Sequence, residues 1–235
     1  QELKSLTASI DKEPNLYARF IHNYSGYPQF RELTLMIKKG MIGRITNLRI
    51  EMPSDGYARI DRIGPPQNWR QTPTEIPMIY LDLGTHLYHL VRRLIGKSSG
   101  IVNAVGSILS NKLNMLDNVE IWEQRDDGIS ISYWFSKAHL GIKNGLKIEV
   151  YGSKGSLTWF QHDPDFIKFS DKDSNIMKIN RGNTSKQISK LDRFKAGHPT
   201  GFVEAFANFY SDLAYDYLAH KKGKNNSRWI SDISE

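Results

Sequence analysis

The stretch LKIEVYGSKGSLTWFQ, residues 146–161, contains two β-strand patterns on either side of a tight turn. Its branched and aromatic residues predict strands over 146–151 and 157–161, and the residues between 152 and 155 predict the turn. Strands joined by a short turn are antiparallel neighbours, so this stretch predicts a β-hairpin. The same combination recurs in the second half of the chain, with strands expected over 101–109, 119–124, 129–135 and 166–169 and turns over 126–128 and 143–145.

Helical patterns surround these strands. Apolar residues recur at helical spacing, which predicts helices over 2–10, 29–39, 84–95 and 201–218. Two more strands are expected over 16–22 and 45–52, a proline-rich loop over 53–80, and a polar irregular segment over 170–199. This order predicts an α+β fold, in which helices pack on one face of an open, predominantly antiparallel or mixed sheet.

Composition excludes several classes of protein. The chain has 235 residues and no cysteine, which rules out a disulfide framework, a thiolate metal site and a cysteine nucleophile. Its apolar runs are far shorter than the roughly 20 residues of a membrane span, so no membrane partner is expected. The formal charge of +7 is spread along the chain apart from a terminal basic cluster. No nucleic-acid motif accompanies that charge, so we expect no nucleic-acid partner.

The sharpest chemical feature is Asp82-Leu83-Gly84-Thr85-His86, where the proline-rich loop meets a predicted helix. A carboxylate and an imidazole four residues apart at a helix start can project to the same side, and an imidazole exchanges a proton near neutral pH. The structural alternative is that Asp82 caps the helix and His86 is a partly buried histidine. His89 offers a third metal ligand beside them, but the spacing is not that of a zinc motif, and no metal site is expected.

Other candidate positions are scattered along the chain. Tyr24 follows a predicted strand, where α/β folds tend to place ligands, unless it is merely a tyrosine packed within a loop. Trp69 and Arg70 offer a flat ring and a fixed cation, unless Trp69 merely pins the loop to the core. His198 precedes the last predicted helix. The sequence has no dinucleotide-binding fingerprint, P-loop or nucleophile elbow, so nothing in it is expected to cradle a pyrophosphate.

Taken in series, these segments resemble the C-terminal part of the Gfo/Idh/MocA family of NAD(P)-dependent oxidoreductases. One such motif is weakly specific, whereas their common order and spacing over nearly the whole chain is specific. The matching runs are HNYSGYP (22–28), WR (69–70), DLGTH (82–86), NGL (144–146), VYGSKGSL (150–157), AGHP (196–199) and EAFAN (204–208).

The resemblance implies a Rossmann domain that binds NAD or NADP, followed by an α+β domain that binds substrate. It assigns residues 1–24 to the last helix and strand of a truncated Rossmann domain and 25–235 to the substrate-binding and oligomerisation domain. It further implies hydride transfer to or from a sugar, cyclitol or sugar derivative, in the cytoplasm. A homodimer or tetramer is expected to assemble through the open sheet face.

The same match implies roles for individual residues. His86 would be the proton acceptor or donor, and Asp82 its partner or a substrate ligand. Tyr24 would approach both the nicotinamide and the substrate. The remaining substrate contacts implied are Trp69, Arg70, Asn144 and His198.

Two departures from the family pattern affect the expected activity. The family's catalytic lysine, in a Glu-Lys-Pro motif, should lie upstream of this sequence, so the chain alone is expected to bind no cofactor and to be inactive. The stretch before Asp82, residues 76–81, is bulky where many members have glycines, which predicts altered specificity or a degraded site. The alternative function is therefore a catalytically dead remnant that acts as a binding or oligomerisation module.

Overall fold

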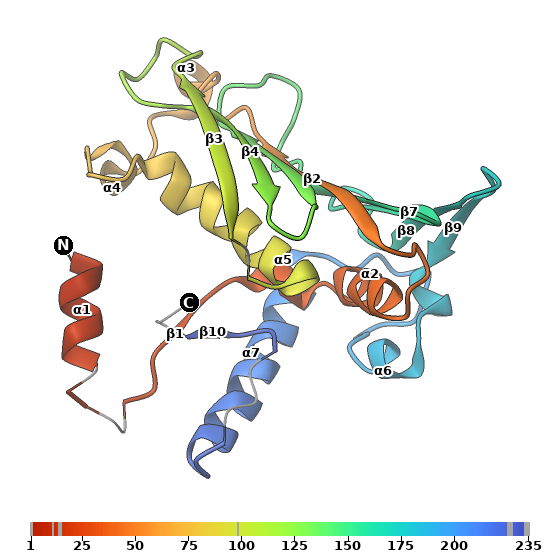
Figure 1. Ribbon diagram of the computed structural model, residues 1–235. Helices are drawn as coiled ribbons and strands as arrows, with labels where there is room; N and C mark the ends of the chain where they lie inside the picture. The colour runs from red at the N-terminus through yellow and green to blue at the C-terminus, as the bar shows by residue number, and fades with distance from the viewer. Residues whose placement is uncertain (1, 11, 14–15, 98, 225–227, 233–235) are drawn as a thin grey trace.

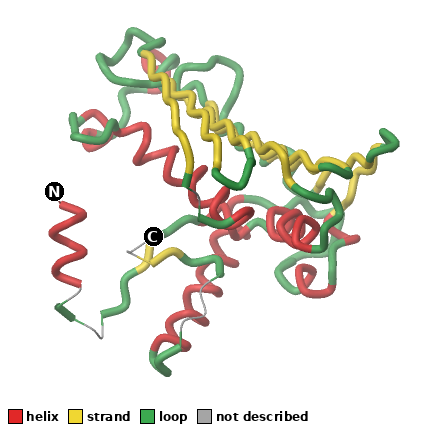
Figure 2. Tube along the Cα trace, in the orientation of Figure 1, coloured by secondary structure: helices red, strands yellow, loops and turns green. Residues whose placement is uncertain are grey.

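An open β-sheet forms one layer of the molecule, and helices cover one of its faces (Figures 1 and 2). The computed structural model describes residues 2–10, 12–13, 16–97, 99–224 and 228–232. Within these ranges the sheet has eight strands in the order β3-β4-β5-β2-β6-β7-β8-β9. The predicted α+β fold with a mixed open sheet is therefore confirmed.

The elements follow the predicted order. The strands of the sheet are β2 (Ile45–Pro53), β3 (Gly100–Ser107), β4 (Asn118–Arg125), β5 (Ser130–Ser136), β6 (Lys147–Gly152), β7 (Gly155–Phe160), β8 (Phe166–Asp171) and β9 (Ile176–Asn180). The helices are α1 (Glu2–Ile10), α2 (Pro28–Lys38), α3 (Ile60–Ile63), α4 (Asn68–Gln71), α5 (Thr85–Ile95), α6 (Lys186–Ser189) and α7 (Phe202–His220). No helix in the described part of the chain is long and apolar enough to cross a membrane.

Strand β2 lies inside the sheet although it precedes its neighbours in the sequence. It pairs parallel with β5 and antiparallel with β6. The prediction that the turn over 143–145 joins adjacent strands is therefore wrong, because the connection from β5 to β6 crosses the end of β2. Backbone hydrogen bonds fasten this crossing: Ser54 N–H donates to the Ser136 carbonyl (2.8 Å), and Gly145 N–H donates to the Pro53 carbonyl (2.9 Å).

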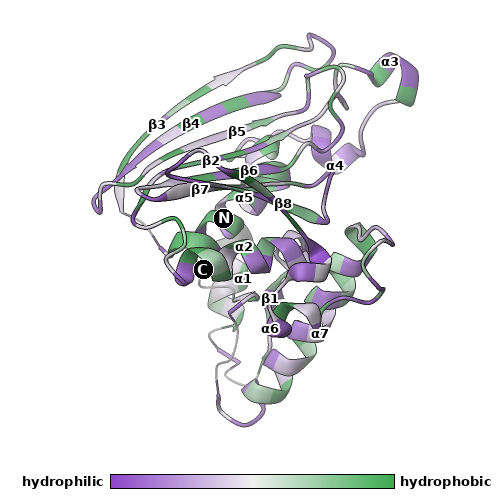
Figure 3. Ribbon diagram, turned by 90° about the vertical axis from the view of Figure 1, so that its right-hand side faces the viewer, coloured by the Kyte–Doolittle hydropathy of each residue, from purple (hydrophilic) through white to green (hydrophobic). Residues whose placement is uncertain are grey.

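The helix-covered face of the sheet is the hydrophobic core. Alternate side chains of β2, such as Leu48 and Ile50, are at most 1% exposed, as the two-residue period of a strand requires. Phe30 from α2 and Leu90 from α5 are fully buried in the same cluster. Figure 3 shows the strands stacked above these two helices. Full burial of one such side chain is worth about 1.5–3 kcal/mol, so this layer fixes the position of α5.

Two segments differ from the sequence prediction. Residues 170–199, expected to be irregular, contain β9 and α6. Strand β9 is held at the sheet edge by pairing with β8, while Ile176 and Met177 remain 66% and 57% exposed, so it lacks the alternation of a half-buried strand. The strand expected over 16–22 shortens to β1 (Arg19–Phe20), because its antiparallel partner, β10 (Ser231–Asp232), is equally short.

The turn that carries Tyr24 packs directly on the start of α7. This 3₁₀ turn, η1 (Asn23–Gly26), comes so close that a Cβ added to Gly26 would lie 2.0 Å from the Ala205 carbonyl oxygen. Asn208 Nδ2 donates to the Gly26 carbonyl at 3.0 Å. Any side chain at position 26 would clash, so Gly26 sets the distance between η1 and α7.

We expect Gly26→Ala to lower the free energy of unfolding by about 1–3 kcal/mol, the usual cost of overpacking, because the clash is with backbone atoms. Gly56→Ala is the matched control, since nothing lies within 4 Å of its added Cβ. Urea denaturation followed by circular dichroism measures both variants. Equal stability of the two would contradict the close approach of η1 and α7.

Candidate active site

Asp82 and His86 lie within one continuous helical segment. The segment begins at residue 78, passes through a π-helical turn, η2 (Tyr80–Gly84), and continues as α5. Gly84 allows this turn to approach the sheet, because a Cβ there would lie 3.3 Å from the Phe135 ring. Asp82 is therefore inside the helix, and the alternative that it caps the helix is wrong. Such π-helical turns are frequent at functional sites.

Two cations hold the Asp82 carboxylate. Arg70 donates to it from Nε (3.0 Å) and Nη2 (2.9 Å), and the Lys137 ammonium forms an ion pair with the same group. Burial raises the pKa of Asp82, but the hydrogen bonds from Arg70 and the charge of Lys137 outweigh burial and hold that pKa below its usual value. Asp82 is thus a fixed, ionised carboxylate, 12% exposed.

His86 follows Asp82 by one helical turn and faces His22 and Tyr24. Its Nδ1 lies 3.4 Å from Nδ1 of His22, and its ring meets the Tyr24 ring edge-on with centroids 5.0 Å apart. Burial lowers the pKa of His86, and the charge of Asp82 offsets only part of that effect. The His86 imidazole is therefore neutral at pH 7 and able to accept a proton.

His22 and His89 complete a cluster of three imidazoles. The His22 ring stacks on the His89 ring at 4.5 Å, and His89 Nδ1 lies 2.9 Å from Ser231 Oγ. Burial, followed by the charges of His86 and Arg93, lowers the pKa of His22 to about 4. Burial also holds the pKa of His89 well below its ordinary value. All three rings are therefore kept uncharged together.

The possible trio of Asp82, His86 and His89 does not converge on one point. Asp82 is engaged by Arg70 and Lys137, while His89 is directed to Ser231. Across the ranges that the structure describes, no three His, Cys, Asp or Glu side chains are grouped so as to hold a metal ion.

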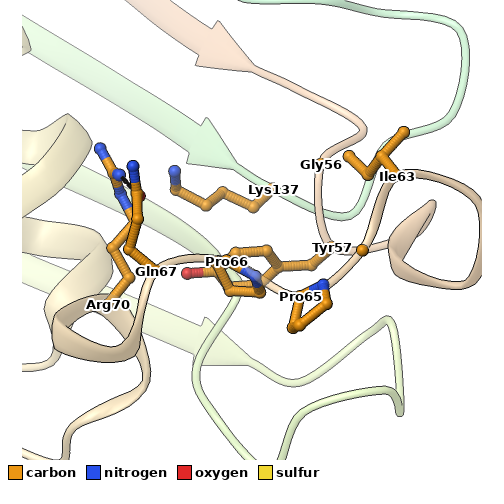
Figure 4. Close-up of a pocket in the computed structure, with 9 residues that line it drawn as sticks. Gly56, Tyr57, Ile63, Pro65, Pro66, Gln67, Arg70 and Lys137 are labelled. Atoms are coloured by element: carbon orange, nitrogen blue, oxygen red, sulfur yellow. Dashed lines mark hydrogen bonds between the residues drawn. The ribbon is translucent and has the colours of Figure 1, made fainter.

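Two hollows adjoin this group. The larger, of about 540 Å³, is lined by the three histidines and by apolar side chains that include Leu81. The smaller, of about 370 Å³, is lined by Arg70, Lys137, Tyr57 and the proline-rich loop (Figure 4). The charge of Asp82 acts on His86 beside the first hollow and on Tyr57 in the second. Asp82 therefore links the two hollows electrostatically.

Trp69 and Arg70 come together with this group. The loop over 53–80, expected to lack structure of its own, forms the single turns α3 and α4, and α4 carries both residues. The Arg70 guanidinium lies over the Trp69 ring, 4.2 Å from its centroid. Trp69 is 51% exposed, so the alternative that it pins the loop to the core is wrong.

Asn144 and His198 are placed elsewhere. Asn144 is exposed, with a φ of +49°, in the connection that crosses the end of β2. His198 is also exposed, and its carbonyl accepts a hydrogen bond from Arg181 Nη2 at 2.7 Å. In the described part of the chain, no hydrogen bond, ion pair or ring contact joins either side chain to Asp82 or His86.

The bulky stretch over 76–81 mainly serves the core. Met78 and Ile79 are buried, and Tyr80 packs edge-on against Phe135 with ring centroids 5.4 Å apart. Leu81, 42% exposed, is the member that lines the larger hollow. The bulk before Asp82 therefore reaches the candidate site through Leu81.

Lys137 and Tyr57 belong to the site but lie in no motif that is visible in the sequence. Tyr57 comes soon after β2, and Lys137 directly follows β5. Because β2 and β5 are parallel, both residues emerge at the same edge of the sheet, where α/β proteins often place ligands. Finding these two residues requires the order of strands in the sheet, which the strand patterns in the sequence do not give.

A family model and a curated relative each match more than half of this chain. Residues 30–158 match the model of the GFO/IDH/MocA C-terminal domain. The chain is 25% identical over 223 residues to an uncharacterized oxidoreductase, YfiI, of Bacillus subtilis (strain 168), covering 91% of this chain and 56% of that protein.

Two solved structures share the fold. An inositol dehydrogenase homolog from Azotobacter vinelandii, complexed with NAD+, has a TM-score of 0.84 at 23% identity, covering 94% of this chain and 59% of that one. Levoglucosan dehydrogenase, in complex with NADH and levoglucosan, has a TM-score of 0.80 at 22% identity, covering 99% of this chain and 63% of that one. The chain thus spans less than two thirds of each of these proteins.

We expect the stability of the protein to fall as the pH decreases from about 6.5 to about 4. In this window the unfolded chain protonates its histidines while folded His22 stays neutral, so the unfolded state binds more protons and stability decreases with falling pH. Each such histidine contributes at most ~1.4 kcal/mol per pH unit. Urea denaturation across this pH range measures the effect.

His22→Gln should make this pH dependence less steep, while His86 and His89 continue to contribute to it. His162→Gln, which replaces an exposed imidazole outside the cluster, should leave it unchanged. A His22→Gln variant that loses stability as steeply as the wild type would contradict the neutral cluster.

Proposed function

The chain belongs to the Gfo/Idh/MocA family, and on that premise we propose that it is the substrate-binding part of an NAD- or NADP-dependent oxidoreductase. The proposed reaction is hydride transfer to or from a sugar, cyclitol or sugar derivative. Support comes from two proteins of similar fold, an inositol dehydrogenase homolog and a levoglucosan dehydrogenase.

The observation that carries the proposal is the neutral His86 imidazole at the larger hollow. Oxidation of a hydroxyl requires a base that takes the hydroxyl proton as the hydride leaves. His86 performs this step, and the same proton returns to the product oxygen in the reverse direction. Because Nδ1 of His86 contacts His22, Nε2 of His86 is the nitrogen that would accept the substrate proton.

Asp82 is a positioning residue in this scheme. When His86 accepts a proton, the ionised Asp82 carboxylate stabilises the resulting imidazolium by charge. Arg70 and Lys137 keep that carboxylate ionised and fixed, so its charge does not have to reorganise during the reaction.

The larger hollow fits the nicotinamide end of the cofactor. Its walls include Ile21, Leu81 and Tyr88, each more than 40% exposed and suited to a flat ring. These side chains would hold the ring, and the bound cofactor would accept or supply the hydride. Tyr24, assigned to the cofactor by the family resemblance, is buried behind the hollow against His86. The sequence has no glycine-rich turn for the pyrophosphate, so this chain fits only that end of the cofactor.

The remaining assignments rest on the family resemblance. We propose Tyr24, Trp69, Arg70, Asn144 and His198 as substrate contacts. We also propose that residues 1–24 complete a Rossmann domain and that 25–235 form the substrate-binding and oligomerisation domain.

We propose that copies of the chain assemble as a homodimer or tetramer through the helix-free face of the sheet. On this face Trp122 is 60% exposed beside a shallow hollow of about 380 Å³. Arg49, Glu51 and Glu120 line the same hollow, so both charge signs are available for pairing between copies. A catalytically dead remnant would retain this surface, so oligomerisation does not distinguish it from an active enzyme. The contribution of His86 to turnover does distinguish them.

His86→Ala is expected to reduce turnover by roughly 100-fold or more, the usual contribution of a positioned acid or base. The assay follows cofactor reduction with a panel of sugars and cyclitols, using the chain joined to or supplied with a dinucleotide-binding domain. His162→Ala, an exposed histidine outside the site, is the control. Unchanged turnover in a folded His86→Ala variant would remove His86 from the mechanism.

Trp122→Glu should convert the proposed oligomer to monomer, because it replaces an exposed apolar ring on the open face with a charge. Tyr215→Glu, which replaces a 68% exposed aromatic residue on α7, should not. Size-exclusion chromatography with light scattering measures both. A wild-type monomer, or an oligomer that survives Trp122→Glu, would contradict assembly through this face.

A further inference from the structure

The smaller hollow is a basic cavity. Figure 4 shows the ammonium end of Lys137 directed toward the Arg70 guanidinium across the opening, with Tyr57 and Pro66 beneath them. Gln67 supplies a further polar group. Among the described residues that line the hollow there is no Asp or Glu. Its walls therefore present positive charge and hydrogen-bond donors.

The carboxylates around the hollow do not cancel this charge. Asp82 is shared between Arg70 and Lys137, so one carboxylate serves two cations. Asp55 pairs with Arg59, and Asp61 pairs with Lys112.

Asp117 is the remaining carboxylate that acts on Tyr57. It is fully buried and is outside the lining of the hollow. Its oxygens accept hydrogen bonds from the backbone N–H groups of Leu109 (2.8 Å) and Ser110 (2.9 Å). Asp117 is therefore bound to backbone groups and does not contact a ligand in the cavity.

Both cations retain donors for a ligand. A guanidinium has five N–H groups, and Arg70 directs Nε and Nη2 to Asp82 and Nη1 to Gln67. An ammonium has three, and Lys137 contacts Asp82 while lying 5.5 Å from the centroid of the Tyr57 ring. Lys137 and Arg70 are 14% and 25% exposed, so an anion between them would meet partly dehydrated charges.

We propose that this hollow binds the anionic group of an acidic sugar, either a carboxylate or a phosphate. The inference rests on the proposed function and narrows its substrate class. Arg70 and Lys137 together carry one more positive charge than the single Asp82 carboxylate between them balances, and a guanidinium with an ammonium matches an anion. Asp82, which pairs with both cations, precedes His86 by one helical turn, so an anion bound here would hold a sugar near the proposed base.

Calorimetric titration of the chain tests this inference, because the described residues form the whole lining of the hollow. The probes are D-glucuronate and D-glucose 6-phosphate, with D-glucose as the neutral match and inorganic phosphate as the free anion. At least one acidic sugar should bind tenfold or more tightly than D-glucose. The tighter of the two acidic probes identifies the anion.

Lys137→Met should abolish this preference, because it removes the ammonium group. Lys137→Arg, which keeps the charge, should retain the preference. Lys178→Met is the control, because Lys178 is a 57% exposed lysine paired with Asp163 on another part of the sheet.

Three results would overturn the inference: acidic sugars binding no more tightly than D-glucose, a preference that survives Lys137→Met, or inorganic phosphate binding as tightly as D-glucose 6-phosphate. These results are independent of the proposed reaction, which stands or falls with the turnover of His86→Ala.

Discussion

The ion pairs of Asp82 with Arg70 and Lys137 are the interaction on which the candidate site depends. They join the proline-rich loop, the helical segment of α5 and the end of β5 through one carboxylate. A buried carboxylate without partners would protonate or destabilise the fold, so the two cations are required for Asp82 to be present as an anion. Because it is an anion, Asp82 acts on His86 and Tyr57 and thereby couples two hollows that share no wall residue.

The histidine cluster shows the opposite electrostatic arrangement. His22, His86 and His89 are brought together with burial as the dominant influence, so each pKa falls and the rings remain neutral. A neutral imidazole is a competent base, whereas an imidazolium is not. The protein thus keeps its fixed charge on Asp82 and its exchangeable proton on His86, four residues apart on one helical segment.

Most of the fold was predictable from sequence because the hairpins of the second half have short turns and local strand patterns. Prediction failed where long-range pairing decides the structure: β2 lies between β5 and β6, and β9 is held by its neighbour rather than by burial. The same limit applies to the site. The spacing of Asp82 and His86 is local and visible, whereas Lys137 reaches Asp82 from the end of β5, a contact between distant parts of the chain.

The position of β2 also governs how the chain folds during synthesis. Asn47 pairs with Ser130, and Leu48 with Val150, so β2 leaves the ribosome long before either neighbour exists. Until then both edges of β2 are unpaired. Its apolar side chains, among them Leu48 and Ile50, have no sheet in which to become buried. Unpaired apolar strands are templates for aggregation, and pairings distant in sequence form slowly. Nascent chains that end before β6 therefore expose an edge of β2 that the folded protein covers.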